Sequence, residues 1–299
     1  MSQELSIRRK TGISPGMLLA RRALRTRSLL VGSALFLILL LAILFFPLVA
    51  PLDPLTINYG EMLDGPSPRH PLGTDELGRD LLSRVIIGGR ASLMIGLEVM
   101  ILTAVFGTLI ALAIGLFDAA DMVVMRFMDI MMAFPSLLLA IALLAILRNS
   151  PLGVVIALTV VYTPRTVRVL RSEVLTLREQ LYVEAARAVG VRTPTILVRH
   201  ILPGIVPVLV VQETFLFAYA ILAEAGISFV GVGVQPPQPS WGNILGDARA
   251  ILSEAPWLVV FPGLAIMASV LSLNLIGDGL REVLDPKRRK NERLSLGKG

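Results

Sequence analysis

Few side chains in this sequence could make or break covalent bonds. The chain has no cysteine, and its two histidines, His70 and His200, lie far apart and in no HExxH metal motif. Its only Gly-Lys pair is next to the C-terminal end, so there is no Walker A phosphate loop. Ser228 would need a neighbouring base to act as a nucleophile, and no lysine or histidine is near it in the sequence. We expect no enzymatic activity, no metal site and no cofactor in this chain.

Three polar side chains within long apolar stretches suggest a different kind of chemistry. Glu98, Gln212 and Glu213 each interrupt such a stretch. An ionisable group inside a membrane is costly and by default faces the helix bundle or a water-filled path. We interpret these three residues as a candidate lining of a translocation pathway. A structural hydrogen bond between helices is the alternative for each of them.

The composition is that of an integral membrane protein. Of the 299 residues, 55% are hydrophobic and 17% are charged, whereas soluble domains carry about 25% charged residues. A helix needs roughly 20 apolar residues to cross a bilayer. Six runs approach this length, so we expect an all-α polytopic protein with six transmembrane helices. The runs lie near residues 28–49, 91–117, 127–147, 152–170, 201–223 and 257–279.

Basic residues are concentrated between alternate runs, which predicts the orientation. Cytoplasmic loops carry an excess of lysine and arginine. If the N-terminus is cytoplasmic, 22 of the 28 Lys and Arg residues fall on the cytoplasmic side. We therefore expect both termini in the cytoplasm, and segments 50–90 and 224–256 outside. The basic charge is explained by topology, so we expect lipid contacts and no nucleic acid.

These boundaries divide the chain into five segments. The division is a basic cytoplasmic segment 1–27, a first transmembrane helix 28–49, an extracytoplasmic loop 50–90 with an amphipathic helix, a core of five transmembrane helices 91–279 that includes the cytoplasmic loop 171–200, and a basic cytoplasmic tail 280–299. In the second run, Thr103, Gly107, Ala111 and Gly115 are four residues apart and share one helix face. Small residues on one face allow close approach of another helix.

The cytoplasmic loop has an unusual helical pattern for a connection between spans. Apolar residues spaced three and four apart predict one helical face, and Gly190 follows where a left-handed residue would end the helix. A second helix is expected near Thr193, with Pro194 in its first turn. The segment could rest on lipid headgroups or dock into a soluble partner. The face comprises Val174, Leu177, Leu181, Ala185 and Ala188.

The stretch "EAARAVGVRTPTILVRHILPG", residues 184–204, resembles the EAA loop of ABC importer permeases. It departs from that pattern at His200, where isoleucine is expected. The resemblance implies a coupling helix that binds the ATP-binding subunit. The matching residues are Glu184, Ala185, Ala186, Arg187, Gly190, Leu202 and Pro203.

Further motifs narrow the resemblance. "HPLGTDELGRDLLSRVIIGGRASL", "MRFMDIMMAFPSLLLAI", "GVGVQPPQPSWGNIL" and "NLIGDGLREVLDPK" are similar to the C-type permease of the dipeptide/oligopeptide/nickel family, and the match extends over about residues 28–287. It implies a type I ABC importer permease in the plasma (inner) membrane of a prokaryote. The implied partners are a second homologous permease, two ATP-binding subunits that hold ATP and magnesium, and an extracytoplasmic solute-binding protein. The family takes up peptides, glutathione, nickel chelates and peptide antibiotics, so the solute stays open.

The outer segments carry more specific expectations. Thr74 is a candidate N-cap of a surface helix over 75–90. Three prolines in "QPPQPSW" exclude a regular helix, and Trp241 is expected at the membrane interface. Asp129 is expected to pair with Arg126. Similarly, Asp278 is expected to pair with Arg281.

The alternative function is a secondary transporter driven by an ion gradient, although that class often shows repeated halves and none is evident.

Overall fold

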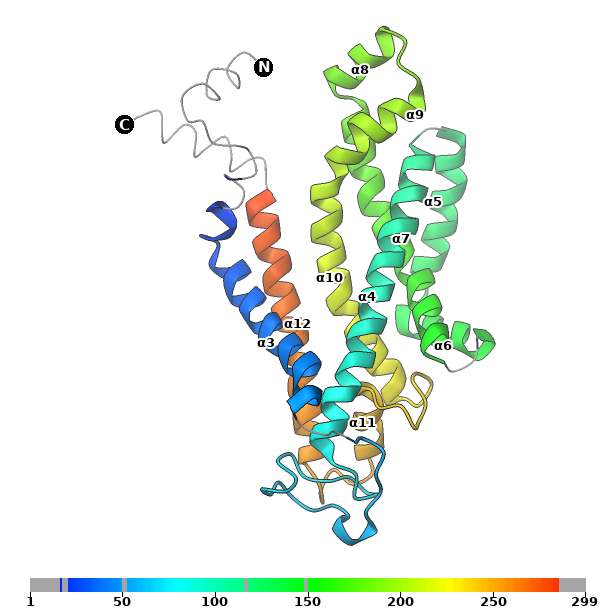
Figure 1. Cartoon of the computed structure of the whole chain (residues 1–299). Coiled ribbons are helices and arrows are strands. Elements are labelled where there is room, and N and C mark those ends of the chain that lie inside the picture. The colour runs from blue at the N-terminus through cyan, green and yellow to red at the C-terminus, as the bar shows by residue number, and fades with distance from the viewer. Residues whose placement is uncertain (1–16, 18–20, 50–52, 116–117, 148–149, 285–299) are drawn as a thin grey trace.

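The computed structural model describes residues 17, 21–49, 53–115, 118–147 and 150–284, and this part of the chain is an α-helical bundle without strands (Figure 1). Five of its helices are long and apolar enough to cross a membrane, or six if one bent pair counts as a span. The predicted all-α fold is confirmed. The basic ends 1–16 and 285–299, predicted to be cytoplasmic, lie outside the described residues. The five long helices are α3 (Arg27–Val49), α4 (Leu81–Ile114), α7 (Pro151–Arg178), α10 (Leu202–Phe229) and α12 (Trp257–Leu284).

The third predicted span is not one straight helix. It consists of α5 (Asp118–Ala133) and α6 (Ser136–Leu147), which are bent by 97° at their junction. Pro135 lies at the break, and proline lacks the N–H group that would continue the helix. Residues 118–126 form the first turns of α5. Figure 1 shows α5 beside α7, with α6 turned away from the direction of α5.

The close approach predicted for the small residues of α4 is confirmed. Thr103, Gly107 and Ala111 are buried, and α4 packs along α7. A Cβ atom at Gly107 would collide with the Thr166 methyl group, and one at Gly115 would lie 2.6 Å from Val174 Cγ1. The two backbones can come this close only because the facing side chains are small.

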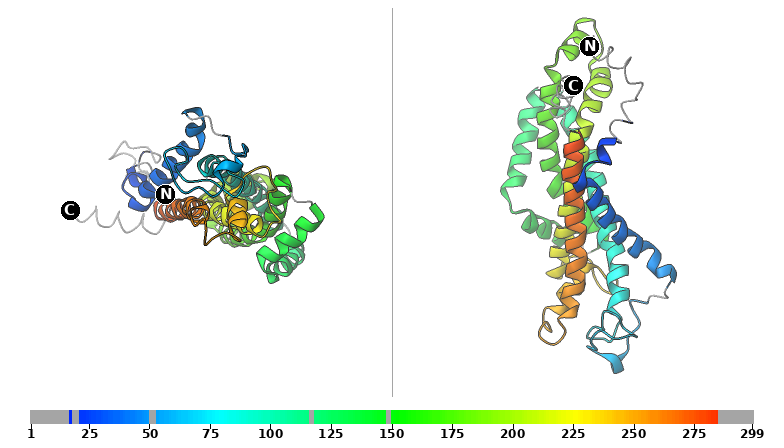
Figure 2. Two further views of the ribbon diagram at one scale, coloured as in Figure 1. Left: turned by 90° about the horizontal axis from the view of Figure 1, so that it is seen from below. Right: turned by 90° about the vertical axis from the view of Figure 1, so that its left-hand side faces the viewer.

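The segments that connect the long helices lie in two groups, one at each end of the bundle. The helices α8 (Leu181–Ala188) and α9 (Thr193–Ile196) lie at one end, on the same side as the start of α3 and the end of α12. Loop 53–80 and α11 (Trp241–Ala248) lie at the opposite end. Figure 2 shows the same separation in a perpendicular view, with α3 packed along α12. This alternation agrees with the predicted grouping of loops, and the opposite end is called the outer end below.

The predicted helix over 75–90 is present only from Leu81 onward, as the first turns of α4. Residues 75–80 form a turn, and α4 begins at Leu81 with Asp80 as its N-cap, whose Oδ2 accepts from the Ser83 amide at 2.7 Å. The Thr74 hydroxyl instead donates to the Glu61 carbonyl at 2.5 Å, beside the short 3₁₀ helix η1 (Tyr59–Glu61). Asp80 competes better for the cap because its side chain reaches the free amides of the first turn.

Trp241 is buried within the protein. Residues 235–240 are not helical, as expected, but Trp241 is the first residue of α11 and is only 1% exposed. Its indole N–H donates to the Val85 carbonyl at 2.9 Å, which joins α11 to α4. The ring is large enough to fill the space between these helices, and its polar nitrogen has a partner there.

Neither of the two predicted local ion pairs is found among the residues that the structure describes, and one of the aspartates pairs with a different arginine. Asp129 of α5 pairs with Arg168 of α7, not with Arg126. The second link between these helices is the pair of Asp121 with Arg171. Both pairs cross between α5 and α7, because the carboxylates face the neighbouring helix. No ion pair between Asp278 and Arg281 is found in the described part of the chain.

Candidate functional site

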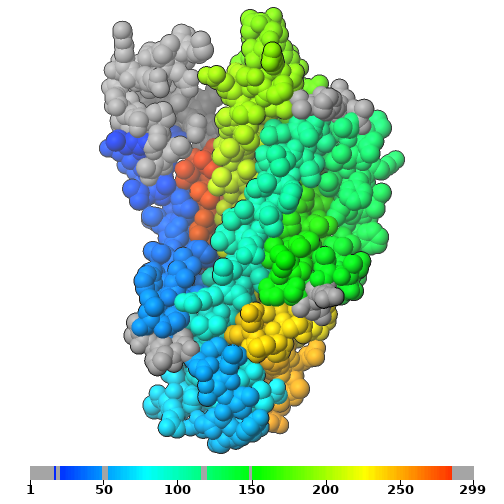
Figure 3. Space-filling view, turned by 45° about the vertical axis from the view of Figure 1, so that its right-hand side comes forward, coloured from blue at the N-terminus to red at the C-terminus, as the bar shows by residue number. Residues whose placement is uncertain are grey.

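The helix α8 forms the tip of a projection at one end of the bundle (Figure 3). Val183 and Ala186 face inward and pack with residues of α7 and of the following helices. The opposite side is exposed and partly apolar: Leu181 is 81% exposed and Val189 is 79% exposed. Large apolar side chains that project into solvent indicate a binding surface. We call the exposed residues 181, 182, 184, 185 and 187–189 the α8 surface.

Gly190 ends α8 in the left-handed conformation that the sequence predicts. Its φ is +80°, and the amide of Val191 donates to the Ala186 carbonyl at 3.0 Å. The Gly190 amide donates to the Arg187 carbonyl at 2.9 Å. These two bonds form a Schellman motif, which satisfies the last carbonyls of the helix. The motif fixes the direction in which the chain leaves α8.

The predicted continuous face from Val174 to Ala188 was wrong in two respects. The helix α7 ends at Arg178, so α8 is a separate element with its own direction. In addition, Leu181 and Ala185 are exposed, whereas Val174 is fully buried. The spacing predicted helices correctly, but a three- to four-residue period does not reveal the turn at residues 179–180.

The return from α8 to the membrane is almost continuous helix. The helix α9 begins at Thr193, as predicted, with Pro194 in its first turn. It passes into the π-helix η2 (Leu197–Ile201) and then into α10, where Leu202 is half-buried and Pro203 is exposed. The His200 ring stacks on Tyr182 with 6.4 Å between ring centroids. The chain from α9 to α10 thus has no non-helical break.

The three pathway candidates occupy different environments. Glu98 lies near the middle of α4 and is exposed, and Gln212 of α10 is half-buried. Glu213 is only 4% exposed, and the hydroxyls of Thr103 and Thr166 each donate to its carboxylate at 2.8 Å. In this conformation Glu213 joins α4, α7 and α10, which matches the structural alternative given for it above.

A second buried carboxylate was missed in the sequence. Glu224 is fully buried and accepts hydrogen bonds from Ser92 at 2.8 Å and Ser228 at 2.7 Å. The fifth apolar run was ended at residue 223, and α10 in fact continues to Phe229. Ser228, considered above as a nucleophile, is thus occupied with a structural hydrogen bond.

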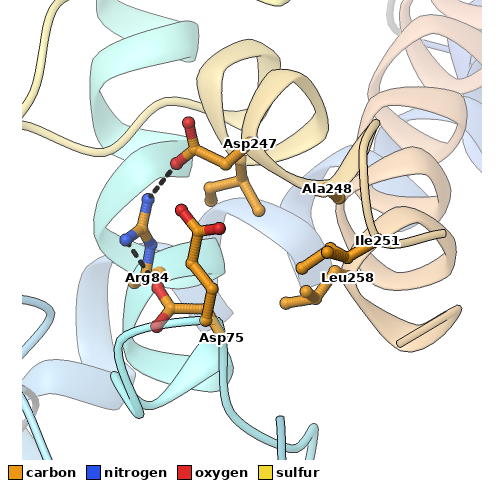
Figure 4. Close-up of a pocket in the computed structure, with 8 residues that line it drawn as sticks. Asp75, Arg84, Asp247, Ala248, Ile251 and Leu258 are labelled. Atoms are coloured by element: carbon orange, nitrogen blue, oxygen red, sulfur yellow. Dashed lines mark hydrogen bonds and ion pairs between the residues drawn. The ribbon is translucent and has the colours of Figure 1, made fainter. Parts of the chain in front are cut away.

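At the outer end, an arginine lies between two carboxylates and forms a hydrogen bond with each (Figure 4). Arg84 Nη1 donates to Asp75 at 2.7 Å, and Nη2 donates to Asp247 of α11 at 3.2 Å. Arg84 is 5% exposed, and together these residues line a small cavity with Ala248, Ile251 and Leu258. Burial raises the pKa of the Asp247 carboxyl, while nearby Arg84 acts in the opposite direction. The network fixes loop 53–80 against α4 and α11.

Two negative groups surround the histidine of the outer loop. His70 Nδ1 lies 2.9 Å from Asp80 Oδ1, and Nε2 lies 3.2 Å from Glu61 Oε2. The hydrogen bond with Asp80 raises the pKa of His70. Asp80 also caps α4, so His70 contacts the side chain that joins the loop to the start of the helix. No cluster of metal-ligating residues was found among the described residues.

A family model confirms the resemblance. It is described as the inner membrane component of binding-protein-dependent transport systems, and it matches residues 103–290. The chain belongs to this family of transport permeases. Accordingly, the permease is a membrane subunit of an ABC transport system. The matched range includes the α8 surface, Gly190 and the return into α10.

Relatives of known name cover nearly the whole permease. A protein of Brucella suis biovar 1, provisionally named a permease of a peptide transport system, is 46% identical over 92% of this chain and 93% of its own. A di/tripeptide transport system permease of Pseudomonas aeruginosa is 45% identical over 86% and 87%. A glutathione transport system permease of Pectobacterium atrosepticum is 41% identical over 94% of both chains.

Proposed function

We propose that this permease forms one half of a heterodimeric pore in an ATP-driven importer of dipeptides, oligopeptides or related small solutes. The second half would be a homologous permease. The names of the relatives support this choice, because they refer to peptides, di/tripeptides and glutathione. The pore would open alternately to the two sides of the membrane.

Two separate ATP-binding subunits would supply the energy and would hold the ATP and magnesium. The α8 surface is the observation that carries this proposal. It is exposed, it contains apolar Leu181 and Val189, and the Gly190 turn fixes its direction. Glu184, Ala185, Ala186 and Arg187 belong to the docking helix, and Leu202 with Pro203 begins α10. Movement of the ATP-binding subunits would therefore turn α10 directly.

The orientation follows from the same assignment. The α8 surface would lie in the cytoplasm, together with both ends of the chain. Loop 53–80 and α11 would then face outward and receive an extracytoplasmic solute-binding protein. Their rigid attachment through Arg84 suits such a contact. The host membrane would be the plasma (inner) membrane of a prokaryote.

Glu98 and Gln212 would contribute to the solute pathway. Glu98 lies 17 residues after Leu81 and 16 before Ile114, which places it at about the middle of α4. An exposed carboxylate at this depth is costly against lipid, so it should face the second permease or the pore. A carboxylate there would suit the positive amino terminus of a peptide.

Purification from native membranes tests the composition of the assembly. The permease, tagged and produced at its natural level, should retain two ATP-binding proteins and a homologous permease. Membranes that contain this complex and its solute-binding protein should take up a labelled dipeptide only with ATP. A permease that purifies alone and transports with an ion gradient would contradict the proposal.

A further inference from the structure

The cytoplasmic half of α7 carries a polar stripe on its exposed side. Arg165, Arg168, Ser172 and Thr176 are exposed and follow one another at intervals of three, four and four residues. This spacing places them on one face of the helix. Arg165 and Arg168 lie within the expected span 152–170, where charged groups in hydrocarbon are costly, so this part of the stripe should not face lipid.

The outer half of α7 shows where lipid can contact the helix instead. Leu152, Ile156 and Val160 are exposed, apolar and spaced four residues apart. Arg165 follows Val160 by five residues, which corresponds to a rotation of about 140° around the helix. The polar stripe therefore faces away from the apolar one.

Arg165 is the first residue of this stripe and lies near the middle of α7. It is 14 residues from Pro151 and 13 from Arg178, or about 20 Å from either end of α7. Its guanidinium carbon is 4.8 Å from the centroid of the Tyr219 ring of α10.

Two other arginines of α7 have carboxylate partners. Arg168 pairs with Asp129, and Arg171 pairs with Asp121. Arg165 contacts an aromatic ring, and it has no carboxylate partner among the described residues. A guanidinium is always charged and presents its donors in a plane that matches a carboxylate. The vacant donors of Arg165 thus fit an anionic group supplied from outside this chain.

We propose that Arg165 lines the translocation pathway and binds the carboxylate of the transported solute, with Tyr219 as the surface that holds its guanidinium. This inference rests on the proposed import of peptides, each of which has a carboxyl-terminal carboxylate. Arg165 and the exposed Glu98 would recognise opposite charges, but each can be tested separately.

Uptake by charge-altered variants tests the need for the cation. Arg165→Gln should lower uptake of a dipeptide by about tenfold or more, because hydrogen bonds to charged groups are stronger than neutral ones. Arg165→Lys should retain more uptake than Arg165→Gln. Both complexes should retain the second permease and the ATP-binding proteins. Loss of the second permease from Arg165→Gln would instead assign Arg165 to the subunit interface.

Chemical restoration of the charge gives a second test, because the chain has no cysteine. Arg165→Cys should react with water-soluble 2-aminoethyl methanethiosulfonate, which restores a positive charge and should recover part of the uptake. Methyl methanethiosulfonate adds no charge and should not recover uptake. The wild-type complex, treated in the same way, controls for cysteines in other subunits. Absence of reaction in the assembled complex would contradict a position in a water-filled path.

Protection from labelling tests the carboxylate directly and does not require import. The probe is Tyr219→Cys in a complex that retains Arg165. A dipeptide at high concentration on the cytoplasmic side should slow labelling of this cysteine, because the cation that binds the carboxylate is still present. The free acid should protect Tyr219→Cys more than the amidated dipeptide does. Equal protection, or none, would overturn the inference. If the wild-type complex imports no dipeptide, the proposed function fails; if it imports and Arg165→Gln imports equally well, only this inference fails.

Discussion

The carboxylate of Glu213 accepts a hydrogen bond from the hydroxyl of Thr166 at 2.8 Å, which joins α10 to α7 inside the bundle. Thr103 of α4 donates to the other carboxylate oxygen at the same distance. Three helices thus meet at one side chain. The helix α10 also continues toward the α8 surface, so this junction is connected through α10 to the proposed docking helix.

Replacement of Glu213 should therefore affect stability as well as transport. Glu213→Ala removes the acceptor for both threonine hydroxyls and should destabilise the purified complex by about 1–3 kcal/mol. Glu213→Gln retains one acceptor oxygen and should cost less. Thermal unfolding of the complex in detergent checks this order. Equal melting temperatures for wild type and Glu213→Ala would show that the junction contributes nothing.

The contact of Gly107 with Thr166 gives a paired prediction. Gly107→Ala places a methyl group against the Thr166 methyl and should destabilise the complex by about 1–3 kcal/mol, as overpacking does. Thr166→Ser removes that methyl but keeps the hydroxyl that bonds Glu213, so the double variant should recover part of the loss. The melting temperatures of the two single variants and the double variant measure the coupling. Simple additivity would contradict the close contact.

The outer loop should depend on pH through His70. Its pKa is raised in the folded protein above the ordinary value of 6.5, so its stabilising contribution is complete below that value and is lost as pH rises through the raised pKa. The difference in melting temperature between wild type and His70→Gln should be largest near pH 6 and should shrink in alkaline buffer. Arg69→Gln, which changes a non-titrating partner of Glu61, is the control. A difference that grows with pH would refute the assignment.

Much of the fold follows from the sequence because a bilayer imposes simple rules. Apolar length predicted α3, α4, α7, α10 and α12, although α7 contains Pro164 and Arg165. Apolar length could not predict the bend at Pro135, because both halves of the bent pair remain apolar. The start of α4 was misplaced because Thr74 and Asp80 are both good capping residues by type, and only the folded loop decides between them.

In the candidate site, the sequence predicted backbone features better than the directions of side chains. Gly190 and Pro194 have strong backbone preferences, so the ends of α8 and α9 could be inferred from residue type alone. The direction of side chains could not be inferred in the same way. Glu213 and Glu98 look alike in the sequence, yet one is buried between two threonines and the other is exposed. Such differences depend on packing between distant helices.

The Gly190 turn should be sensitive to backbone strain rather than to side-chain size. A Cβ atom there would meet nothing within 4 Å, but its φ of +80° is unfavourable for other residues. Gly190→Val should cost roughly 1–2 kcal/mol locally, whereas Gly190→Asn should be milder, because asparagine enters this region more readily. Uptake per assembled complex should fall more for valine than for asparagine. The opposite order would show that the turn does not set the direction of α8.

The retention of ATP-binding subunits by α8 surface variants tests the central claim most directly. Leu181→Asp and Val189→Asp place charges on exposed apolar positions, and Leu252→Asp makes the same change at a residue that is 51% exposed at the outer end. The account predicts that the two α8 surface variants reach the membrane in normal amount but lose co-purified ATP-binding subunits and uptake, while Leu252→Asp retains those subunits. If Leu181→Asp and Val189→Asp retain the ATP-binding subunits in the wild-type amount and also retain full uptake, α8 is not the docking helix.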